Sequence, residues 1–243
     1  MCCFSALNAQ RFPAHEEPEE PRNKGNAILL HLSFAGHIPF NDLADRFGKS
    51  LAFGGGVEYI TTHNWIFGVE GHSIFGTEVK EDPLAVIRTN AGDIIGNDML
   101  IASVLLRERG LYIGALGGKL WTFGKQRSGL RFTFGGGFLR HRIRVQDDSQ
   151  TVTQITGEYL KGYDRLTGGL ALQQFIGWQH LGNQRRSNWM LGFEINQGFT
   201  HSFREWDFTE RRKLSGSRFD LRIGIRAAWT LPFYQKKASE IFY

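Results

Sequence analysis

The chain has 243 residues, enough for one domain of ordinary size. It holds no run of about 18 apolar residues, which excludes a transmembrane helix. The formal net charge is +5 at pH 7 and the pI is about 9.3. The Lys and Arg residues are scattered and no nucleic-acid motif accompanies them, so nucleic acid is not an expected partner. The same basic residues could bind anionic lipopolysaccharide at a membrane surface.

The composition fits two all-β folds. The mean hydropathy of −0.29 is that of a soluble protein, and 30 Gly with 20 Phe, 6 Trp and 6 Tyr is typical of a soluble β-sandwich. The same residues suit a narrow membrane barrel, because only every second residue of its strands faces lipid and average hydropathy hides it. Composition alone favours the sandwich.

The N-terminal region is interpreted as two short segments. Cys2 and Cys3 begin an apolar stretch that ends at Ala9, so residues 1–9 are interpreted as the remnant of a secretory signal peptide. Residues 10–26 are polar and hold half of the six prolines, which predicts a disordered periplasmic lead. Two adjacent cysteines without a nearby His pair do not predict a zinc site, and no cofactor or metal is expected.

Alternation of apolar and polar residues starts at residue 28 and predicts eight strands. In the last strand, every second residue from Phe219 to Phe233 is apolar, whereas Asp220 and Arg222 lie between them. One face of each strand is therefore apolar, and the other is small, polar or charged. The clear strands cover 28–35, 51–59, 65–72, 189–200 and 219–233, and the weaker ones cover 111–122, 130–143 and 168–180.

The lengths of the connections separate the two folds. The short connections are 62–64, 123–129 and 181–188, and the long ones, which alternate with them, are 39–49, 77–110, 144–166 and 205–217. Membrane barrels alternate short periplasmic turns with long outer loops, whereas a sandwich with Greek-key crossovers has no reason to do so. We therefore predict an all-β fold, an eight-stranded antiparallel transmembrane β-barrel with up-and-down meander topology. It covers residues 27–234 and is followed by a periplasmic C-terminal tail, 235–243.

One segment leaves the strand count open. Residues 97–107 are apolar enough to pair with 111–121 as a ninth strand, which would break the alternation of connection lengths. We place this segment in the second outer loop instead, as a helix or a strand extension.

Charged residues of inward parity predict a filled lumen. These inward charges are Glu58, Glu70, Lys119, Arg131, Glu194, Arg222 and Arg226. An eight-stranded barrel is narrow enough for side chains to fill it, and buried charges that stay unpaired are costly. Three acids and four bases nearly balance, so we expect a structural network of salt bridges, with His31, His72 and Asn196 as further partners. The alternative is a gated ion path or a ligand site.

Three residues near the outer rim are of the types found in catalytic sites. Small barrels include lipid A deacylases, which use His, Ser and Glu there, and His201, Ser202 and Glu205 lie near the outer end of the seventh strand. Adjacent residues of a strand point to opposite faces, so His201 and Ser202 do not form a nucleophile and its base. No catalytic residue is predicted.

An outer loop carries apolar and aromatic side chains that a solvated loop does not need. The candidate partner-contact loop consists of Tyr159, Leu160, Tyr163 and Arg165. Packing of these loop residues on each other is an equal alternative. Aromatic residues near strand ends, among them Trp65 and Trp121, are expected to form girdles at the membrane interfaces.

Four stretches carry a family resemblance: WIFGVEG at 65–71, LRERGLY at 106–112, YLKGYDRL at 159–166 and the aromatic end at 241–243. They resemble the small eight-stranded outer-membrane β-barrel proteins of Bacteroidota, as a general class. The resemblance implies a barrel and carries no catalytic residue. Several such barrels are subunits of machines for β-barrel assembly or type IX secretion.

The expected function is that of a non-enzymatic accessory or structural subunit of a larger outer-membrane complex. The expected location is the cell outer membrane, with membrane lipids, lipopolysaccharide and other outer-membrane proteins as partners. Two alternatives stay open: an outer-membrane enzyme that modifies lipid A or lipopolysaccharide, and a narrow channel.

Overall fold

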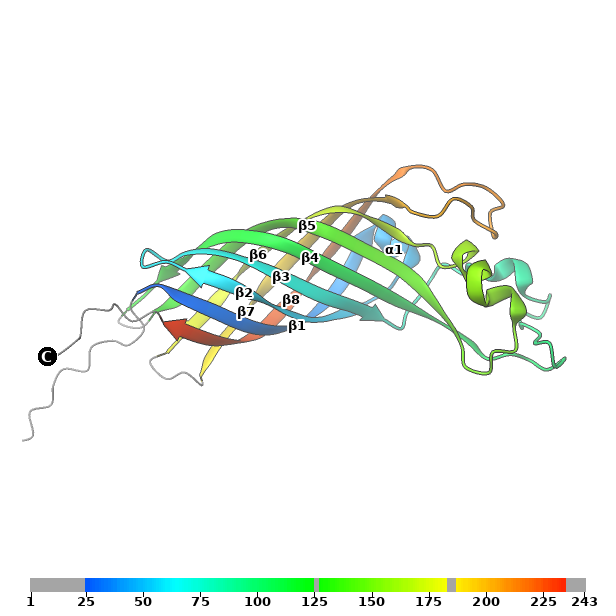
Figure 1. Ribbon diagram of the computed structural model, residues 1–243, viewed down its shortest axis with the longest axis horizontal. Helices are drawn as coiled ribbons and strands as arrows, with labels where there is room; N and C mark the ends of the chain where they lie inside the picture. The colour runs from blue at the N-terminus through cyan, green and yellow to red at the C-terminus, as the bar shows by residue number, and fades with distance from the viewer. Residues whose placement is uncertain (1–24, 125–126, 183–186, 235–243) are drawn as a thin grey trace, which may run out of the picture.

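The computed structural model describes residues 25–124, 127–182 and 187–234, which form one closed β-barrel (Figure 1). Each strand pairs antiparallel with the next along the chain, and β1 closes the ring by pairing with β8. The prediction of an eight-stranded antiparallel meander barrel is confirmed. The strands are β1 (Ala27–Asn41), β2 (Ser50–Ile60), β3 (Trp65–Gly76), β4 (Val104–Thr122), β5 (Arg127–Asp147), β6 (Thr167–Leu181), β7 (Asn188–Ser202) and β8 (Ser217–Tyr234).

The alternation of residue types separates the outer wall of the barrel from its lumen. Along β1, Leu32 and Phe34 are about half exposed on the wall, whereas His31 and Ser33, which alternate with them, are buried. A soluble sandwich would bury the apolar row and expose the polar one. The wall also exposes the indole rings of Trp65, Trp121, Trp178, Trp189 and Trp229.

The connections confirm the alternation of short and long lengths. Residues 61–64 join β2 to β3, whereas 42–49, 77–103, 148–166 and 203–216 form the long connections. All four long connections lie at one end, the right-hand side of Figure 1, which we call the outer end. The ring order of the strands requires this, because antiparallel neighbours return the chain to the same end after every second strand.

Two predicted loop boundaries differ from the structure by four residues or more. The second long connection ends at residue 103 rather than 110, and the third begins at 148 rather than 144, because β4 and β5 stay paired from Val104 and Asp147 inward. Residues 104–107 thus extend β4, while residues 97–103 lie in the loop, where Ile95 forms an isolated bridge with Ile101. Within the described residues no ninth strand is present.

Short helices lie in the long connections at the outer end. The first connection holds α1 (Asp42–Arg46), the second holds η1 (Ala85–Ile87), and the third holds η2 (Thr153–Ile155) and η3 (Gly157–Gly162). In the parts of the chain that the structure describes, no helix is both long enough and apolar enough to cross a membrane. The helices instead contribute to the cap described below.

The segments predicted around the barrel are not tested by the structure. The signal remnant, 1–9, and the C-terminal tail, 235–243, lie outside the described residues, as does the lead, 10–26, apart from its last two residues. These three assignments stay predictions.

Candidate functional site

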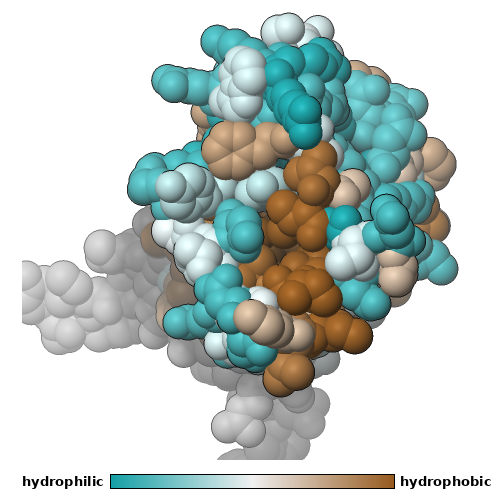
Figure 2. All heavy atoms as spheres, turned by 90° about the vertical axis from the view of Figure 1, so that its right-hand side faces the viewer, coloured by the Kyte–Doolittle hydropathy of each residue, from teal (hydrophilic) through white to brown (hydrophobic). Residues whose placement is uncertain are grey.

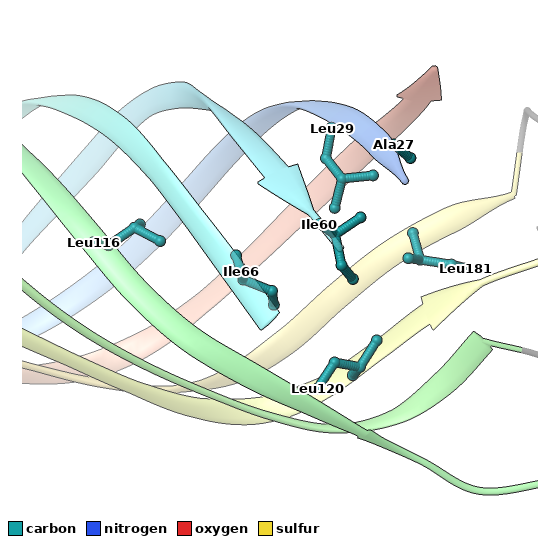
Figure 3. Close-up of a cluster of buried hydrophobic side chains, with 7 residues drawn as sticks. All are labelled: Ala27, Leu29, Ile60, Ile66, Leu116, Leu120 and Leu181. Atoms are coloured by element: carbon teal, nitrogen blue, oxygen red, sulfur yellow. The ribbon is translucent and has the colours of Figure 1, made fainter. Parts of the chain in front are cut away.

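The inner end of the lumen is closed by apolar side chains. The cluster, shown in Figure 3, draws on five of the eight strands and is fully or almost fully buried. Its members are Ala27, Leu29, Ile60, Ile66, Leu116, Leu120 and Leu181. This apolar plug separates the charged part of the lumen from the short-turn end of the barrel.

The first ionic layer follows directly above the plug. The guanidinium of Arg131 donates two hydrogen bonds to the carboxylate of Glu58, at 2.8 and 2.6 Å, and a third to Gln179 at 3.0 Å. The Nδ1 atom of His31 lies 3.4 Å from the same carboxylate. Such two-point contact between arginine and a carboxylate fixes geometry as well as charge.

The second layer is centred on Arg226, which binds two carboxylates. Its guanidinium donates to Glu70 at 2.9 Å and forms a second ion pair with Glu194, and it donates to His72 at 3.0 Å. His37 donates to Glu194 at 2.9 Å. Because every one of these side chains is buried, the layer is a connected network and not a set of surface pairs.

A phenyl ring separates the two guanidinium groups. The ring of Phe175 has Arg131 and Arg226 each 5.9 Å from its centroid. Gly177 and Gly192, which pair across β6 and β7, make room for it, since a Cβ atom on either would lie 2.8 Å from the edge of the ring. Cation–π attraction thus links the two ionic layers.

The third layer lies nearest the outer end. His141 donates to Asp220 at 2.8 Å, Thr200 donates to the same carboxylate at 2.6 Å, and Arg222 lies 3.6 Å from Glu108. The sequence analysis did not include Glu108, because it placed residue 108 in a loop, and it did not select Asp220 or His141. Glu108, Asp220 and His141 each occupy an inward-facing position of their strand. This alternation would have identified Asp220 and His141 directly, and Glu108 once β4 is extended to Val104.

The structure brings six of the seven predicted inward charges into the lumen, but the prediction for Lys119 is wrong. Lys119 faces the outer wall, where its ammonium lies 4.7 Å from the ring of Trp65. In β4 the buried residues are the even-numbered ones, such as Leu116 and Leu120. Small residues dominate the middle of this strand, so its two faces look alike in the sequence.

The charge balance of the lumen also differs from the expected one. Five carboxylates, those of Glu58, Glu70, Glu108, Glu194 and Asp220, face three arginines, Arg131, Arg222 and Arg226. Four histidines, His31, His37, His72 and His141, lie beside these carboxylates. The histidines therefore supply the contacts that the arginines cannot.

The lumen leaves little free volume. A cavity of about 20 Å³ lies between the layers and is lined by His37, Tyr112, Glu194 and Arg222, among others. A cavity of this size holds about one water molecule. The described lumen is therefore a packed polar core rather than a water-filled passage.

A second network ties the outer loops to each other. Arg165, which is 3% exposed, forms ion pairs with Glu81 of the second connection at 2.7 Å and with Asp207 of the fourth. Arg46 of α1 donates to the same Glu81 at 2.7 Å and to Thr167 at 2.8 Å. All four long connections are thus linked through two buried arginines.

A further ion pair and an apolar cluster complete this cap. Arg204 donates two hydrogen bonds to Asp164, which raises the pKa of that guanidinium. Beneath them, side chains from three connections pack together around Leu84, Ile94, Val152, Ile155 and Tyr163. The outer loops therefore form a folded cap with a core of its own.

Part of the candidate partner-contact loop is buried in the cap. Tyr163 and Arg165 are buried inside the cap, so these two residues are not available to a partner. They are buried because the loop residues pack on each other, which was the alternative given above. Leu160 is partly buried against the apolar cluster, whereas Tyr159 is open to contact, with 62% of its surface exposed.

A different segment of the cap presents apolar side chains to the outside. Met99, Leu100 and Ile101 are 87%, 67% and 68% exposed, and Ile95 beside them is 46% exposed. Figure 2 looks onto the outer end and shows hydrophobic surface gathered in one strip between hydrophilic flanks. Sequence analysis assigned 97–107 to a loop but did not select Met99, Leu100 or Ile101.

Backbone hydrogen bonds hold this apolar hairpin, residues 94–102, in shape. The amide of Gly96 donates to Leu100, and the amide of Ala102 donates to Ile94, both at 2.8 Å. The amide of Asn97 donates to Thr151 of the third connection, also at 2.8 Å. The exposed side chains therefore stand on a fixed backbone.

The residues weighed for catalysis do not come together as a site. His201 is exposed and contacts the edge of Phe203, at 4.8 Å between ring centroids, whereas the hydroxyl of Ser202 accepts a hydrogen bond from the amide of Arg204. Glu205 is exposed. Among the described residues, no group of three His, Cys, Asp or Glu side chains is arranged to hold a metal ion.

No protein-family model and no curated protein matches the chain. Among solved structures, it is similar to Neisserial surface protein A, with 11% identity over 85% of this chain and 99% of that one and a TM-score of 0.47. The attachment invasion locus protein Ail of Yersinia pestis, in complex with the heparin analogue sucrose octasulfate, shares 9% identity over 84% and 99%, with a TM-score of 0.39. The outer membrane protein OprG of Pseudomonas aeruginosa shares 9% over 88% and 99%, also with a TM-score of 0.39. Because these scores lie below 0.5, the strand pairing of the chain itself remains the basis for its fold, and the resemblance to barrels of Bacteroidota stays a prediction.

Proposed function

We propose that this chain is a non-enzymatic outer-membrane β-barrel that acts as an accessory subunit and docks another outer-membrane protein through its apolar hairpin, residues 94–102. The observation that carries the proposal is the exposure of Met99, Leu100 and Ile101 on a hairpin fixed by hydrogen bonds. Machines for β-barrel assembly or type IX secretion are the expected kind of complex.

Membrane insertion is supported by the outer wall. Large apolar side chains stay exposed along all eight strands, a far larger patch than soluble monomers carry. A closed barrel satisfies every strand edge internally, which is the condition for strands to cross lipid. The polar cap at one end and the short turn at the other support an orientation in which the outer end faces the cell exterior.

Protein docking is supported by the rigidity of the hairpin as well as by its chemistry. Three consecutive large apolar side chains in water are unfavourable unless a partner covers them. Their backbone is already ordered by the hydrogen bonds of Gly96, Asn97 and Ala102, so a partner would bind without the entropic cost of ordering a loop. A few buried side chains carry most of the affinity of an interface, and methionine is among the residues enriched in interface cores.

The filled lumen favours a scaffold over the narrow channel that was the further alternative. Three ionic layers and an apolar plug occupy the described lumen, and the cavity between the layers has room for about one water molecule. We expect the purified protein to give no stepwise conductance in a planar bilayer, and reproducible single-channel steps would revive the channel hypothesis.

The docking proposal is tested by affinity capture of tagged protein from outer membranes solubilised in mild detergent. We expect a stoichiometric partner with the wild type and loss of that partner with the triple variant Met99→Ser, Leu100→Ser, Ile101→Ser. The matched control is Trp206→Ser, which removes an exposed apolar side chain from another part of the cap. A monodisperse monomer from wild-type membranes, or capture unchanged in the triple variant, contradicts the proposal.

A further inference from the structure

Five arginines gather on the outward face of the β4–β5 hairpin. Arg107 pairs directly with Arg144, and Arg109 pairs with Arg142, so two cross-strand positions carry like charges. Arg140 lies two residues further along β5 on the same face. We call these five residues the arginine cluster.

The arginine cluster begins where the apolar wall ends. On β5 the outward residues from Leu130 to Phe138 include only apolar side chains and glycine, over nine residues, and the next outward residue is Arg140. On β4 the outward residues from Trp121 to Leu111 span eleven residues before Arg109 is reached. They are apolar or glycine except Lys119, whose ammonium lies against the ring of Trp65 near the short-turn end. A transmembrane strand needs about 9–11 residues. The cluster therefore lies at the outer interface of the membrane.

The charges of the cluster are not balanced by the protein. Arg107, Arg140 and Arg144 form no ion pair within residues 25–124, 127–182 and 187–234, and Arg109 donates only to the carbonyl oxygen of Glu108, at 2.8 Å. Like charges directly opposite each other destabilise a sheet. An anion from outside the described protein is the natural counterion.

One carboxylate comes near the cluster without neutralising it. Asp164 lies 4.0 Å from Arg142, at the limit of an ion pair. Both of its oxygens already accept hydrogen bonds from Arg204 in the cap. Arg142 therefore keeps donors that face outward.

The surroundings of the cluster point to an amphiphilic anion rather than a small one. Directly below Arg140 on the same face lies Phe138, whose ring stacks on Phe203 with centroids 6.2 Å apart. Its cross-strand neighbour Leu170 is 73% exposed. A ligand with phosphate at one end and acyl chains at the other would contact both surfaces at once.

We propose that the arginine cluster binds the phosphate groups of an anionic outer-leaflet lipid, of which lipid A is the representative. A planar guanidinium binds phosphate oxygens through two parallel hydrogen bonds. Five guanidinium groups on one hairpin can therefore bind more than one phosphate group. Bound phosphate also removes the repulsion between Arg107 and Arg144 and between Arg109 and Arg142. The inference rests on the membrane insertion stated in the proposed function, but not on the docking hairpin.

The test measures binding of lipid A to the full-length protein in detergent micelles, by native mass spectrometry and by thermal stabilisation. The variants are Arg109→Gln with Arg142→Gln, and Arg140→Gln alone, which leaves both cross-strand pairs intact. The matched control is Arg211→Gln with Lys213→Gln, which removes two exposed charges from the fourth connection. We expect the double variant to weaken lipid A binding by about tenfold or more, because each lost guanidinium removes a charge-assisted contact. The control should bind as the wild type does.

Two further ligands distinguish the source of the phosphate. Dephosphorylated lipid A should bind at least about tenfold more weakly than lipid A, and inorganic phosphate should neither stabilise the protein nor compete at equal concentration. Equal binding of both lipids, equal loss in the control variant, or full competition by inorganic phosphate overturns the proposal. If the double variant does not fold, as judged by its heat-modifiable gel mobility, the result with Arg140→Gln decides. Partner capture with the Met99, Leu100 and Ile101 variant is a separate readout, so the docking proposal can fail without affecting this one.

Discussion

Replacing Arg226 with methionine tests whether the lumen network is the structural core of the barrel. The side chain is buried and its guanidinium pairs with Glu70 and Glu194 at once, so Arg226→Met leaves two buried carboxylates without their arginine. Removing one partner of a buried ion pair costs about 3–5 kcal/mol. Since two pairs are broken and the contact with Phe175 is lost, we expect the upper part of that range.

The assay is urea-induced unfolding of the protein in lipid vesicles, followed by tryptophan fluorescence and gel mobility. Arg211→Met, at an exposed position of the cap, should change the free energy of unfolding by about 0.5 kcal/mol or less. Neutralising both acids as well, with Glu70→Gln and Glu194→Gln, should restore much of the loss, because no unpaired charge remains in the lumen. A cost of less than about 1 kcal/mol for Arg226→Met, or no gain from the triple variant, would refute the reasoning.

Two other predictions concern packing and the cap. Gly192→Ala should destabilise the barrel by about 1–3 kcal/mol in the same assay, because its new methyl group would meet the backbone of Ile176 and Gly177 on β6 as well as the ring of Phe175. Gly136→Ala on the outer wall has space and should fold as the wild type does. Equal effects of the two substitutions would contradict the packed lumen. Arg165→Ala should break the ion pairs with Glu81 and Asp207, leaving Glu81 to Arg46 alone, and make the outer loops cleavable by protease added to intact cells, with the barrel band unchanged on gels. Protease resistance equal to that of the wild type would show that Arg165 does not hold the cap.

The barrel was predictable because its signals are local and repeated. Alternation over five clear strands, together with connection lengths, determines the strand order and the inward face of residues such as Glu58, Glu70 and Arg226. Lys119 was misplaced because Gly114, Gly117 and Gly118 surround it and neither face of β4 stands out in the sequence. The parity rule works only where the two faces differ in side-chain type.

The cap was not predictable for a different reason. Its hub, Arg165, is separated by more than 80 residues from Glu81 and by more than 40 from Asp207, and no period relates such positions. Tyr163 and Tyr159 look equivalent in the sequence, yet one is buried in the cap and the other is exposed. Only the packing of one loop on another distinguishes them.

The long β4–β5 hairpin also determines the height above the membrane at which a partner protein contacts residues 94–102. Residues 104–110 of β4 continue beyond the apolar wall, which at a rise of about 3.3 Å per residue gives roughly 20 Å of additional strand. The apolar hairpin at its end is thus held above the layer of lipid phosphates and the first sugars attached to them. A partner that reaches Met99 and its neighbours must itself project from the membrane, whereas one that stays flush with the lipid surface meets only the arginines.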